Sequence, residues 1–187
     1  MMNILWGVTG SVAAVRAGRI AAALAKLGTV RLIATEAGKR FLEVAEDPLP
    51  TGMAAEDDDA EWRQWRRIGD PVLHIELRKW ADAFVIAPLS ADTLAKLANG
   101  FADNLLLSAA RAWDFRKPMV LVPAMNTLMW EHPITAGQLR TLVGWGAAVV
   151  PPVAKELACG DVGIGGMAPP EAIAAALAGW RAPAGGR

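Results

Sequence analysis

Short apolar runs alternate along the chain with longer segments whose apolar residues recur at helical spacing. The short runs are rich in branched residues and bounded by glycine or proline, so we expect buried strands over residues 3–8, 29–34, 83–87, 119–122 and 147–150. The helical spacing predicts helices over residues 12–27, 37–44, 78–81, 94–98, 103–113, 134–143 and 170–180. A chain in which strands and helices alternate in this way forms a parallel sheet with helices on both faces.

Two segments lack a regular pattern. Residues 46–70 contain Pro48 and Pro50 and an acidic run at 56–59, which we expect to be exposed to solvent. The tryptophan- and arginine-rich part that follows is interpreted as an interface, or as a loop that folds over a neighbour's site. Residues 160–166 contain four glycines, and we expect a mobile segment without a fold of its own. It is either a lid or a linker to the last helix.

The composition narrows the classes of protein that remain. The 187 residues carry 19 basic and 19 acidic side chains, and this balance argues against nucleic acid or an anionic membrane as a partner. The N-terminus lacks the form of a signal peptide, and the uncharged runs are shorter than the ~20 residues of a membrane-spanning helix. A single cysteine allows no intrachain disulfide, which suits a reducing cytoplasm. Too few histidines and cysteines are present to favour a zinc site.

Hydroxyl side chains follow the predicted strands at several turns. Gly10 and Ser11 lie between the first strand and its helix, where a glycine admits close approach and free backbone N–H groups attract a phosphate. Thr35 follows the second strand, at the same edge of the sheet. Ser90 and Thr93 form a second such turn. In each case the alternative is that the hydroxyl only caps a helix.

Three further side chains are candidates for chemistry. Asn126 follows a buried strand, where an amide suits a carboxylate or amide of a substrate, although it also suits a cap of its own turn. His74 lies near a predicted strand end and can exchange a proton near neutral pH, but such a histidine is more often a satisfied core residue. Cys159 opens the glycine-rich segment, whereas most single cysteines are small buried apolar residues.

Several separate motifs resemble one family, the flavin-containing cysteine decarboxylases, and within it the phosphopantothenoylcysteine decarboxylases. The resemblance extends over nearly the whole chain, from about residue 3 to residue 173. The matching segments are GVTGS at 7–11, HIELRKWAD at 74–82, APLSADTLAK at 87–96, DNLL at 103–106, RAWD at 111–114, PAMNTLMW at 123–130 and ACGD at 158–161. The segments at 123–130 and 158–161 are specific, whereas the first glycine turn alone is weak.

The resemblance implies a flavodoxin-like, three-layer, Rossmann-type α/β fold with one parallel sheet. It also implies FMN as cofactor, a small-molecule substrate, and a cytoplasmic homotrimer, or multiple of trimers, with its sites at subunit interfaces. We expect residues 1–181 to form one flavoprotein domain and residues 182–187 to be a disordered tail. The implied activity is decarboxylation of phosphopantothenoylcysteine to phosphopantetheine, in coenzyme A synthesis.

The same resemblance assigns roles to residues. It implies His74 as the catalytic base and Cys159 as the acid that returns a proton. The residues implied to bind the substrate are Asn126, Met129, Ala158 and Lys155. Those implied to contact FMN are Gly10, Ser11, Val12, Thr35, Ser90, Ala91, Asp92, Thr93 and Ala124.

The chain departs from the family pattern at three places. Asp92 stands where many members have asparagine, residues 36–38 replace a hydroxyl-rich stretch, and Glu156 stands where related segments have a lysine that Lys155 would replace. Three alternatives are a peptidyl-cysteine decarboxylase, a non-catalytic flavin-fold regulatory subunit and a flavin prenyltransferase. The ACGD segment argues against the first. Retention of His74, Asn126 and Cys159 argues against the second, and the segment at 123–130 argues against the third.

Overall fold

The structure, a computed structural model, describes residues 1–157 and 160–181. The expected tail at 182–187 and the candidates Ala158 and Cys159 lie outside these described residues.

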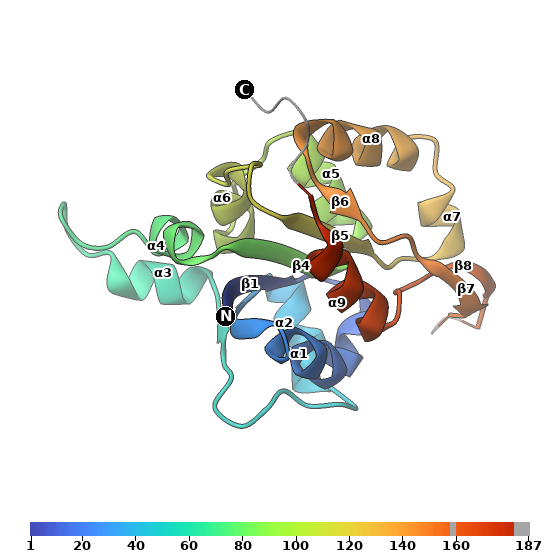
Figure 1. The fold of residues 1–187 in the computed structure, drawn as a ribbon, viewed down its shortest axis with the longest axis horizontal. Helices are drawn as coiled ribbons and strands as arrows, with labels where there is room; N and C mark the ends of the chain where they lie inside the picture. The colour runs from blue at the N-terminus through green and yellow to red at the C-terminus, as the bar shows by residue number, and fades with distance from the viewer. Residues whose placement is uncertain (158–159, 182–187) are drawn as a thin grey trace.

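A parallel sheet forms the centre of the molecule, as the alternating pattern predicts (Figure 1). Its strands lie in the order β3-β2-β1-β4-β5-β6. Their bounds are β1 Met2–Val8, β2 Gly28–Ala34, β3 Ala55–Glu56, β4 Ala83–Leu89, β5 Met119–Pro123 and β6 Ala148–Val149. Without the short edge strand β3, the order is that of a flavodoxin-like sheet, and it reverses direction between β1 and β4. The predicted fold class is therefore confirmed.

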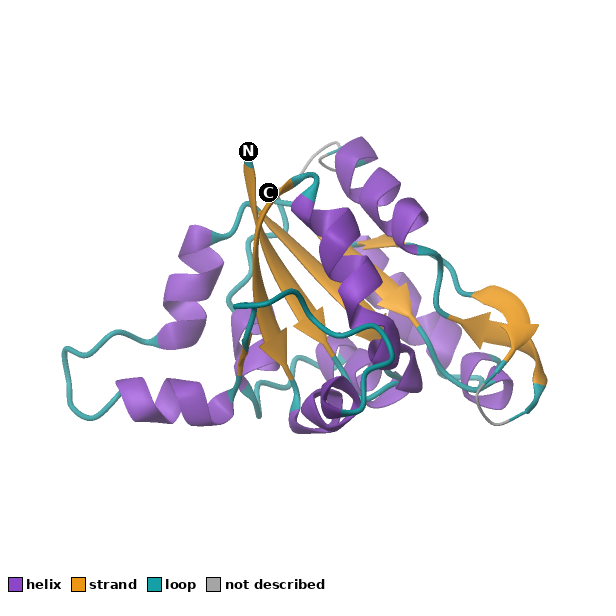
Figure 2. Cartoon of the chain, turned by 90° about the horizontal axis from the view of Figure 1, so that it is seen from below, coloured by secondary structure: helices purple, strands orange, loops and turns teal. Residues whose placement is uncertain are grey.

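Helices cover both faces of the sheet, so the central strands are buried on each side (Figure 2). One face packs against α4 Leu73–Trp80, α5 Ala91–Ala98, α6 Leu105–Arg111 and α8 Thr135–Trp145. The other packs against the 3₁₀ helix η1 Val12–Arg16, α1 Ala17–Ala25, α2 Glu36–Glu43 and α9 Pro170–Gly179. All seven residues of β4 are buried, which explains why that strand reads as a continuous apolar run.

Two helices differ from the sequence-based expectation. The single helix expected over 12–27 is divided into η1 and α1, because Ser11 caps a short 3₁₀ segment before the α-helix begins at Ala17. The helix expected at 78–81 begins earlier, at Leu73, so His74 lies in the first turn of α4 and not at a strand end.

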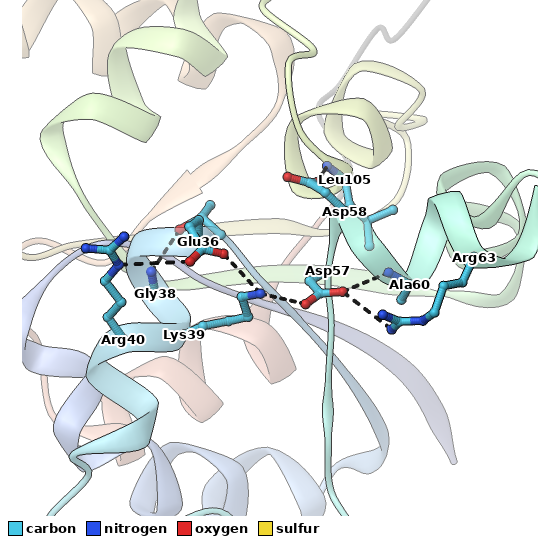
Figure 3. Close-up of polar contacts among 10 residues, drawn as sticks. Glu36, Gly38, Lys39, Arg40, Asp57, Asp58, Ala60, Arg63 and Leu105 are labelled. Carbon is cyan, nitrogen blue, oxygen red and sulfur yellow. Dashed lines mark hydrogen bonds and ion pairs between the residues drawn. The ribbon is translucent and has the colours of Figure 1, made fainter.

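The acidic run of residues 56–59 is more ordered than predicted. Asp57 caps α3 Asp58–Gln64: its Oδ1 accepts a hydrogen bond from Ala60 N at 2.8 Å, and its Oδ2 lies 2.7 Å from Lys39 Nζ on α2 (Figure 3). Asp58 Oδ1 accepts a hydrogen bond from Leu105 N, at the start of α6. The expectation of a solvated run is correct only for Asp59, which is exposed. Acidic residues at a helix N-terminus are stabilising, and this signal identifies the helix that the sequence reading missed.

The glycine-rich segment also has a fold, contrary to expectation. Strand β8 Val162–Gly166 pairs antiparallel with β7 Val153–Glu156 and forms a hairpin beyond the main sheet (Figure 1). The glycines let this strand approach neighbouring backbone closely: a Cβ on Gly165 would lie 2.1 Å from Met125 O, and one on Gly163 would lie 2.4 Å from Thr127 Oγ1. In this hairpin, the absence of a side chain on glycine allows close contact with the neighbouring segment.

Asp57→Ala is expected to lower the free energy of unfolding by about 1–2 kcal/mol, because it removes a helix cap and a partly buried ion pair. Urea denaturation at pH 7 measures this change. Asp59→Ala removes an exposed carboxylate from the same run and serves as the control, with an expected change within about 0.5 kcal/mol. Equal losses in the two variants would contradict the anchoring role of Asp57.

The stabilisation by Asp57 should depend on pH. The hydrogen bond from Lys39 lowers the pKa of Asp57, and the hydrogen bonds to Asp57 and Glu36 raise the pKa of Lys39. A lowered carboxyl pKa gives stability that is present above its unfolded value of about 3.9 and is lost as the pH falls through the folded pKa. A raised lysine pKa gives stability that is present below about 10.4 and is lost as the pH rises through the folded pKa. The difference between wild type and Asp57→Ala should therefore be largest between these limits.

Candidate cofactor and substrate site

A cavity of about 760 Å³ lies at the carboxyl ends of the central strands, beside the point where the strand order reverses. In open α/β sheets this is where ligands bind. Its walls come from the turns after β1, β4 and β5 and from the hairpin β7–β8. The residues that form these walls include 10–13, 90–92, 124–126, 155–157 and 165–167.

The turn after β1 forms part of the cavity wall and packs closely against α2. Gly10 packs against α2 so closely that a Cβ there would lie 2.7 Å from the Cβ of Ala37. Ser11 caps η1 through a long hydrogen bond of 3.4 Å from Ala13 N to its Oγ. The capping alternative is thus correct for Ser11, but the residue also lines the cavity together with Gly10 and Val12. One hydroxyl can serve both purposes.

The turn after β4 is held by a residue that the sequence analysis did not single out. Thr9 is fully buried; its Oγ1 donates to Pro88 O at 2.8 Å and accepts from Ser90 N at 2.8 Å. It therefore joins the ends of β1 and β4. The sequence feature that could have identified Thr9 is its position between the first predicted strand and the glycine turn. Ser90 caps α5, since its Oγ accepts from Thr93 N at 3.3 Å.

The other predicted FMN contacts divide into two groups. Ala91, Asp92 and Ala124 line the cavity, and Asp92 also pairs with Lys96 at 3.5 Å between Oδ2 and Nζ. Thr35 and Thr93 are not among the residues that line it. Thr35 caps α2 by accepting from Gly38 N at 3.1 Å, and Thr93 is buried against Ser90.

Asn126 lies at the edge of the cavity and has a fixed orientation. Its Oδ1 accepts from Leu128 N at 2.8 Å, which caps α7 Thr127–Trp130. Its Nδ2 donates to Oδ2 of Asp161 in the hairpin at 2.7 Å. With the oxygen engaged by the helix, the amide directs its donor group to the hairpin side, where a carboxylate is a suitable acceptor. Met129 and Lys155 line the same cavity.

His74 is held by a buried carboxylate. Its Nδ1 lies 2.5 Å from Oε1 of Glu61, whose side chain belongs to α3 and is 11% exposed. A carboxylate at Nδ1 keeps the ring proton on that nitrogen and leaves Nε2 able to accept a proton. Glu61 has no signal in the sequence that would mark it as a partner of His74, because this pairing arises only when α3 packs against α4.

One chain does not bring His74 and Asn126 together. Helices α3 and α4 lie at one end of the molecule, and α7 and the hairpin β7–β8 lie at the other (Figures 1 and 2). His74 is also not among the residues that line the cavity. Within one chain, His74 and the cavity that contains Asn126 are therefore separate.

The described residues contain neither a cluster of metal ligands nor a membrane-spanning helix. Within residues 1–157 and 160–181, no three histidine, cysteine, aspartate or glutamate side chains gather as metal ligands. No helix in this part of the chain is long and apolar enough to cross a membrane.

A parallel α/β sheet with a cavity at its reversal point, lined here by Ser11 and Ser90 among other residues, is the arrangement in which doubly wound folds bind nucleotide cofactors. The family model described as Flavoprotein matches residues 1–182, so the chain belongs to the flavoprotein family. A phosphopantothenoylcysteine decarboxylase from Oryza sativa subsp. japonica is 49% identical over 171 residues, which cover 91% of this chain and 77% of that protein.

Solved structures of similar proteins have the same fold. A cysteine-to-serine variant of a PPC decarboxylase, in complex with pantothenoylaminoethenethiol, superimposes with a TM-score of 0.90 at 45% identity and covers 95% of this chain and 96% of that one. The FMN-binding protein AtHal3 superimposes with a TM-score of 0.86 at 46% identity, with 95% of each chain covered. The predicted family is confirmed by both comparisons.

Proposed function

We propose that the protein decarboxylates phosphopantothenoylcysteine to phosphopantetheine with FMN as cofactor, a step of coenzyme A synthesis. The observation that carries this proposal is the position of Asn126, which lines the cavity at the carboxyl ends of the strands and holds its amide donor toward the hairpin beside that cavity. The similarity to phosphopantothenoylcysteine decarboxylases over 91% of the chain supports the choice of substrate.

The cavity residues suit FMN. The backbone around Gly10, the hydroxyls of Ser11 and Ser90, and the backbone of Ala124 line the cavity and offer hydrogen-bonding groups to a phosphate and to ribityl hydroxyls. Bound FMN would supply two-electron chemistry, by accepting a hydride from the substrate and later returning it. We propose Val12, Ala91 and Asp92 as further contacts, and Thr35 and Thr93 as residues that hold the cofactor turns in place.

The chemistry explains why these residue types are needed. Loss of CO2 from an amide-linked cysteine requires an acceptor for the electron pair left on carbon. Oxidation of the CH2–SH group to a thioaldehyde provides it, so that CO2 leaves an enethiolate. Reduction and protonation of the enethiolate restore a saturated thiol, so the cycle is redox-neutral. In this scheme His74 accepts the first proton, Asn126 holds the carboxylate, and Cys159 returns a proton.

We further propose that the active unit is a homotrimer or a multiple of trimers. Exposed apolar residues lie at both ends of the folded molecule. Trp62, Trp65 and Ile68 lie near His74, and Val12, Leu128 and Met129 lie near the cavity. Two different surfaces on one chain favour a head-to-tail contact, and a threefold rotation between successive copies closes such contacts into a ring. Such a contact places His74 of one copy at the cavity of the next.

Mixing two inactive variants tests this arrangement. His74→Asn and Asn126→Ala should each be inactive as pure proteins, but co-expressed chains should regain activity. In a random ring of equal parts, roughly a quarter of the interfaces combine an intact histidine with an intact asparagine. Decarboxylation assays on co-purified, differently tagged chains measure the recovery. No recovery from a properly mixed oligomer would show that each site belongs to a single chain.

The phosphate of the substrate has a suitable place beside the main cavity. A second hollow of about 690 Å³ runs between α1 and the start of α9 and shares Arg16, Lys155 and Met167 with the first. Arg19 and Lys26 add positive charge; Glu171 is the acidic residue among its lining, and Arg19 pairs with Asp47 at 2.8 Å. An extended substrate whose cysteine end lies at Asn126 would direct its anionic end to this hollow.

The function itself is tested directly. The purified protein is expected to be yellow, and after saturation with FMN it should convert phosphopantothenoylcysteine into a product that has lost CO2, as measured by mass spectrometry. A peptide that ends in cysteine, the substrate class of the alternative peptidyl-cysteine decarboxylases, is the comparison and should not react. A colourless protein that does not bind added FMN, or a yellow one that acts only on the peptide, would contradict the proposal.

Two further proposals concern the location of the protein and its domain organisation. We place the protein in the cytoplasm, because its single cysteine requires no oxidising compartment. We also treat residues 1–181 as one domain, because the two apolar clusters of the described residues pack on opposite faces of the same sheet.

A further inference from the structure

The acidic residues of α3 do not share one environment. Asp59 is exposed, whereas Glu61 is only 8% exposed and lies where α3 packs against α4. Burial of a charged carboxylate is costly unless a partner compensates for the lost water. Within the described part of the chain, both hydrogen bonds of the Glu61 carboxylate involve His74. The burial of Glu61 is therefore explained by its pairing with this histidine.

The carboxylate contacts His74 at two atoms. Oε1 of Glu61 accepts a hydrogen bond from the backbone N of His74 at 3.3 Å and lies 2.5 Å from its Nδ1. The first contact satisfies a backbone N–H in the first turn of α4, where Val72 supplies no side-chain cap. The second fixes the direction of the imidazole ring. One carboxylate oxygen thus determines where the other ring nitrogen, Nε2, lies.

Helix α3 is itself anchored on two sides (Figure 3). Asp57 caps the helix and pairs with Lys39 of α2, with 2.7 Å between Oδ2 and Nζ. Asp58 accepts a hydrogen bond from Leu105 N at the start of α6. A carboxylate on a fixed helix orients its partner more accurately than one on a mobile loop. The anchoring of α3 therefore gives Glu61 a defined position relative to α4.

We propose that Glu61 is a positioning residue for His74, which acts through the histidine and does not contact the substrate. The inference rests on the proposed role of His74 as the base. The carboxylate keeps the hydrogen of the neutral ring on Nδ1. When Nε2 takes a proton from the substrate, the ring becomes a cation, and the ionised carboxylate stabilises it. The proton passes from Nε2 to solvent before the next turnover, so Glu61 is unchanged over the cycle.

Glu61→Gln tests this role by steady-state kinetics with the FMN-loaded protein. The variant keeps the size of the side chain but loses its charge, and its NH2 group can favour the other tautomer of the ring. We expect kcat for decarboxylation of phosphopantothenoylcysteine to fall about 10- to 100-fold. KM and flavin content should remain at the wild-type values. An unchanged kcat, or a loss that appears only in KM or in flavin content, would overturn the proposal.

Two variants of the same helix separate positioning from charge and stability. Asp59→Asn removes an equal charge from an exposed position and should retain the wild-type kcat. Asp57→Ala weakens the anchor of α3 but leaves the carboxylate of Glu61 in place, so it should lose stability without a comparable loss of kcat. If either variant lost as much kcat as Glu61→Gln, the effect would come from overall charge or from helix stability, and the proposal would be wrong.

A double variant shows whether Glu61 acts through the histidine. Glu61→Gln combined with His74→Asn should be no slower than His74→Asn alone, because a positioning residue has nothing to orient once the base is absent. Single-turnover assays compare the two. A further fall in the double variant would show that Glu61 acts independently of His74 and would contradict the inference.

A measurement on the wild-type protein does not depend on how any Glu61 variant folds. The sequence contains two histidines, so protein with ¹⁵N-labelled histidine gives NMR signals from two imidazole rings, and His74→Asn identifies the signals of His74. We expect the hydrogen of the neutral His74 ring on Nδ1, and a hydrogen on Nε2 would refute the inference. A wild-type protein that binds FMN but does not decarboxylate the substrate would instead refute the proposed function, so the two failures are distinct.

Discussion

His74→Asn is expected to retain FMN and to lose decarboxylation by about 10²–10⁴-fold, the usual effect of removing a general base. Asparagine preserves the size and polarity of the side chain, but its amide cannot accept and release a proton near neutral pH. Oε1 of Glu61 lies 2.5 Å from Nδ1 of the histidine, so the base that we propose would use Nε2. The loss should therefore appear in kcat and leave the flavin content unchanged.

The chain provides a matched control for this variant. His132 is its second histidine; it is exposed, and its Nδ1 accepts from Ile134 N at 3.4 Å. His132→Asn should have near-normal activity. Single-turnover assays, with flavin absorbance to quantify the cofactor, compare the two variants with wild type. Near-normal turnover by His74→Asn, free of wild-type contamination, would show that His74 is a structural residue.

Cys159→Ser is expected to release CO2 once and then stall. We propose this residue as the acid of the second half-reaction, and its place at the head of the hairpin's glycine-rich segment in the sequence motivates the role. A free thiol, with a pKa near 8.5, is mostly protonated at neutral pH and can donate. A serine hydroxyl keeps the shape but is a far weaker acid, and the chain contains no tyrosine as a substitute.

The stalled variant should accumulate reduced flavin and an enethiol that lacks two hydrogen atoms relative to phosphopantetheine. Mass spectrometry of the product and the flavin spectrum under anaerobic conditions detect both. The related cysteine-to-serine variant that binds pantothenoylaminoethenethiol contains a ligand of this chemical type. Saturated product at the normal rate, or no release of CO2 at all, would show that Cys159 is not the late proton donor.

Local pattern determined the elements of the main sheet. Continuous apolar runs such as 83–87 and 119–122 can be buried on both faces only within a parallel sheet, and the structure places both at its centre. The amphipathic segments between them required helices on the two faces. Hydroxyls and glycines after the strands indicated the cavity, because the carboxyl ends of parallel strands meet at one edge.

The predictions for two segments of the chain were wrong. Residues 160–166 read as a mobile segment because glycine is flexible in an isolated chain, yet the described part forms β8, where glycine is needed for close contact with residues 125–127. The acidic run at 56–59 read as a solvated face, yet Asp57 and Asp58 are bound by Lys39 and by Leu105 N. Both errors arise because the partners are distant in sequence.

Local periodicity and motifs of consecutive residues were sufficient to predict the main strands, most of the helices, the family and the candidate residues. The packing of distant segments was needed to reveal that Glu61 contacts His74, that Thr9 joins β1 to β4 and that Asp161 binds Asn126. It also separates His74, on α4, from the residues that line the cavity. These contacts join residues 13 to 81 positions apart, and only the packing of helices and strands brings such residues together.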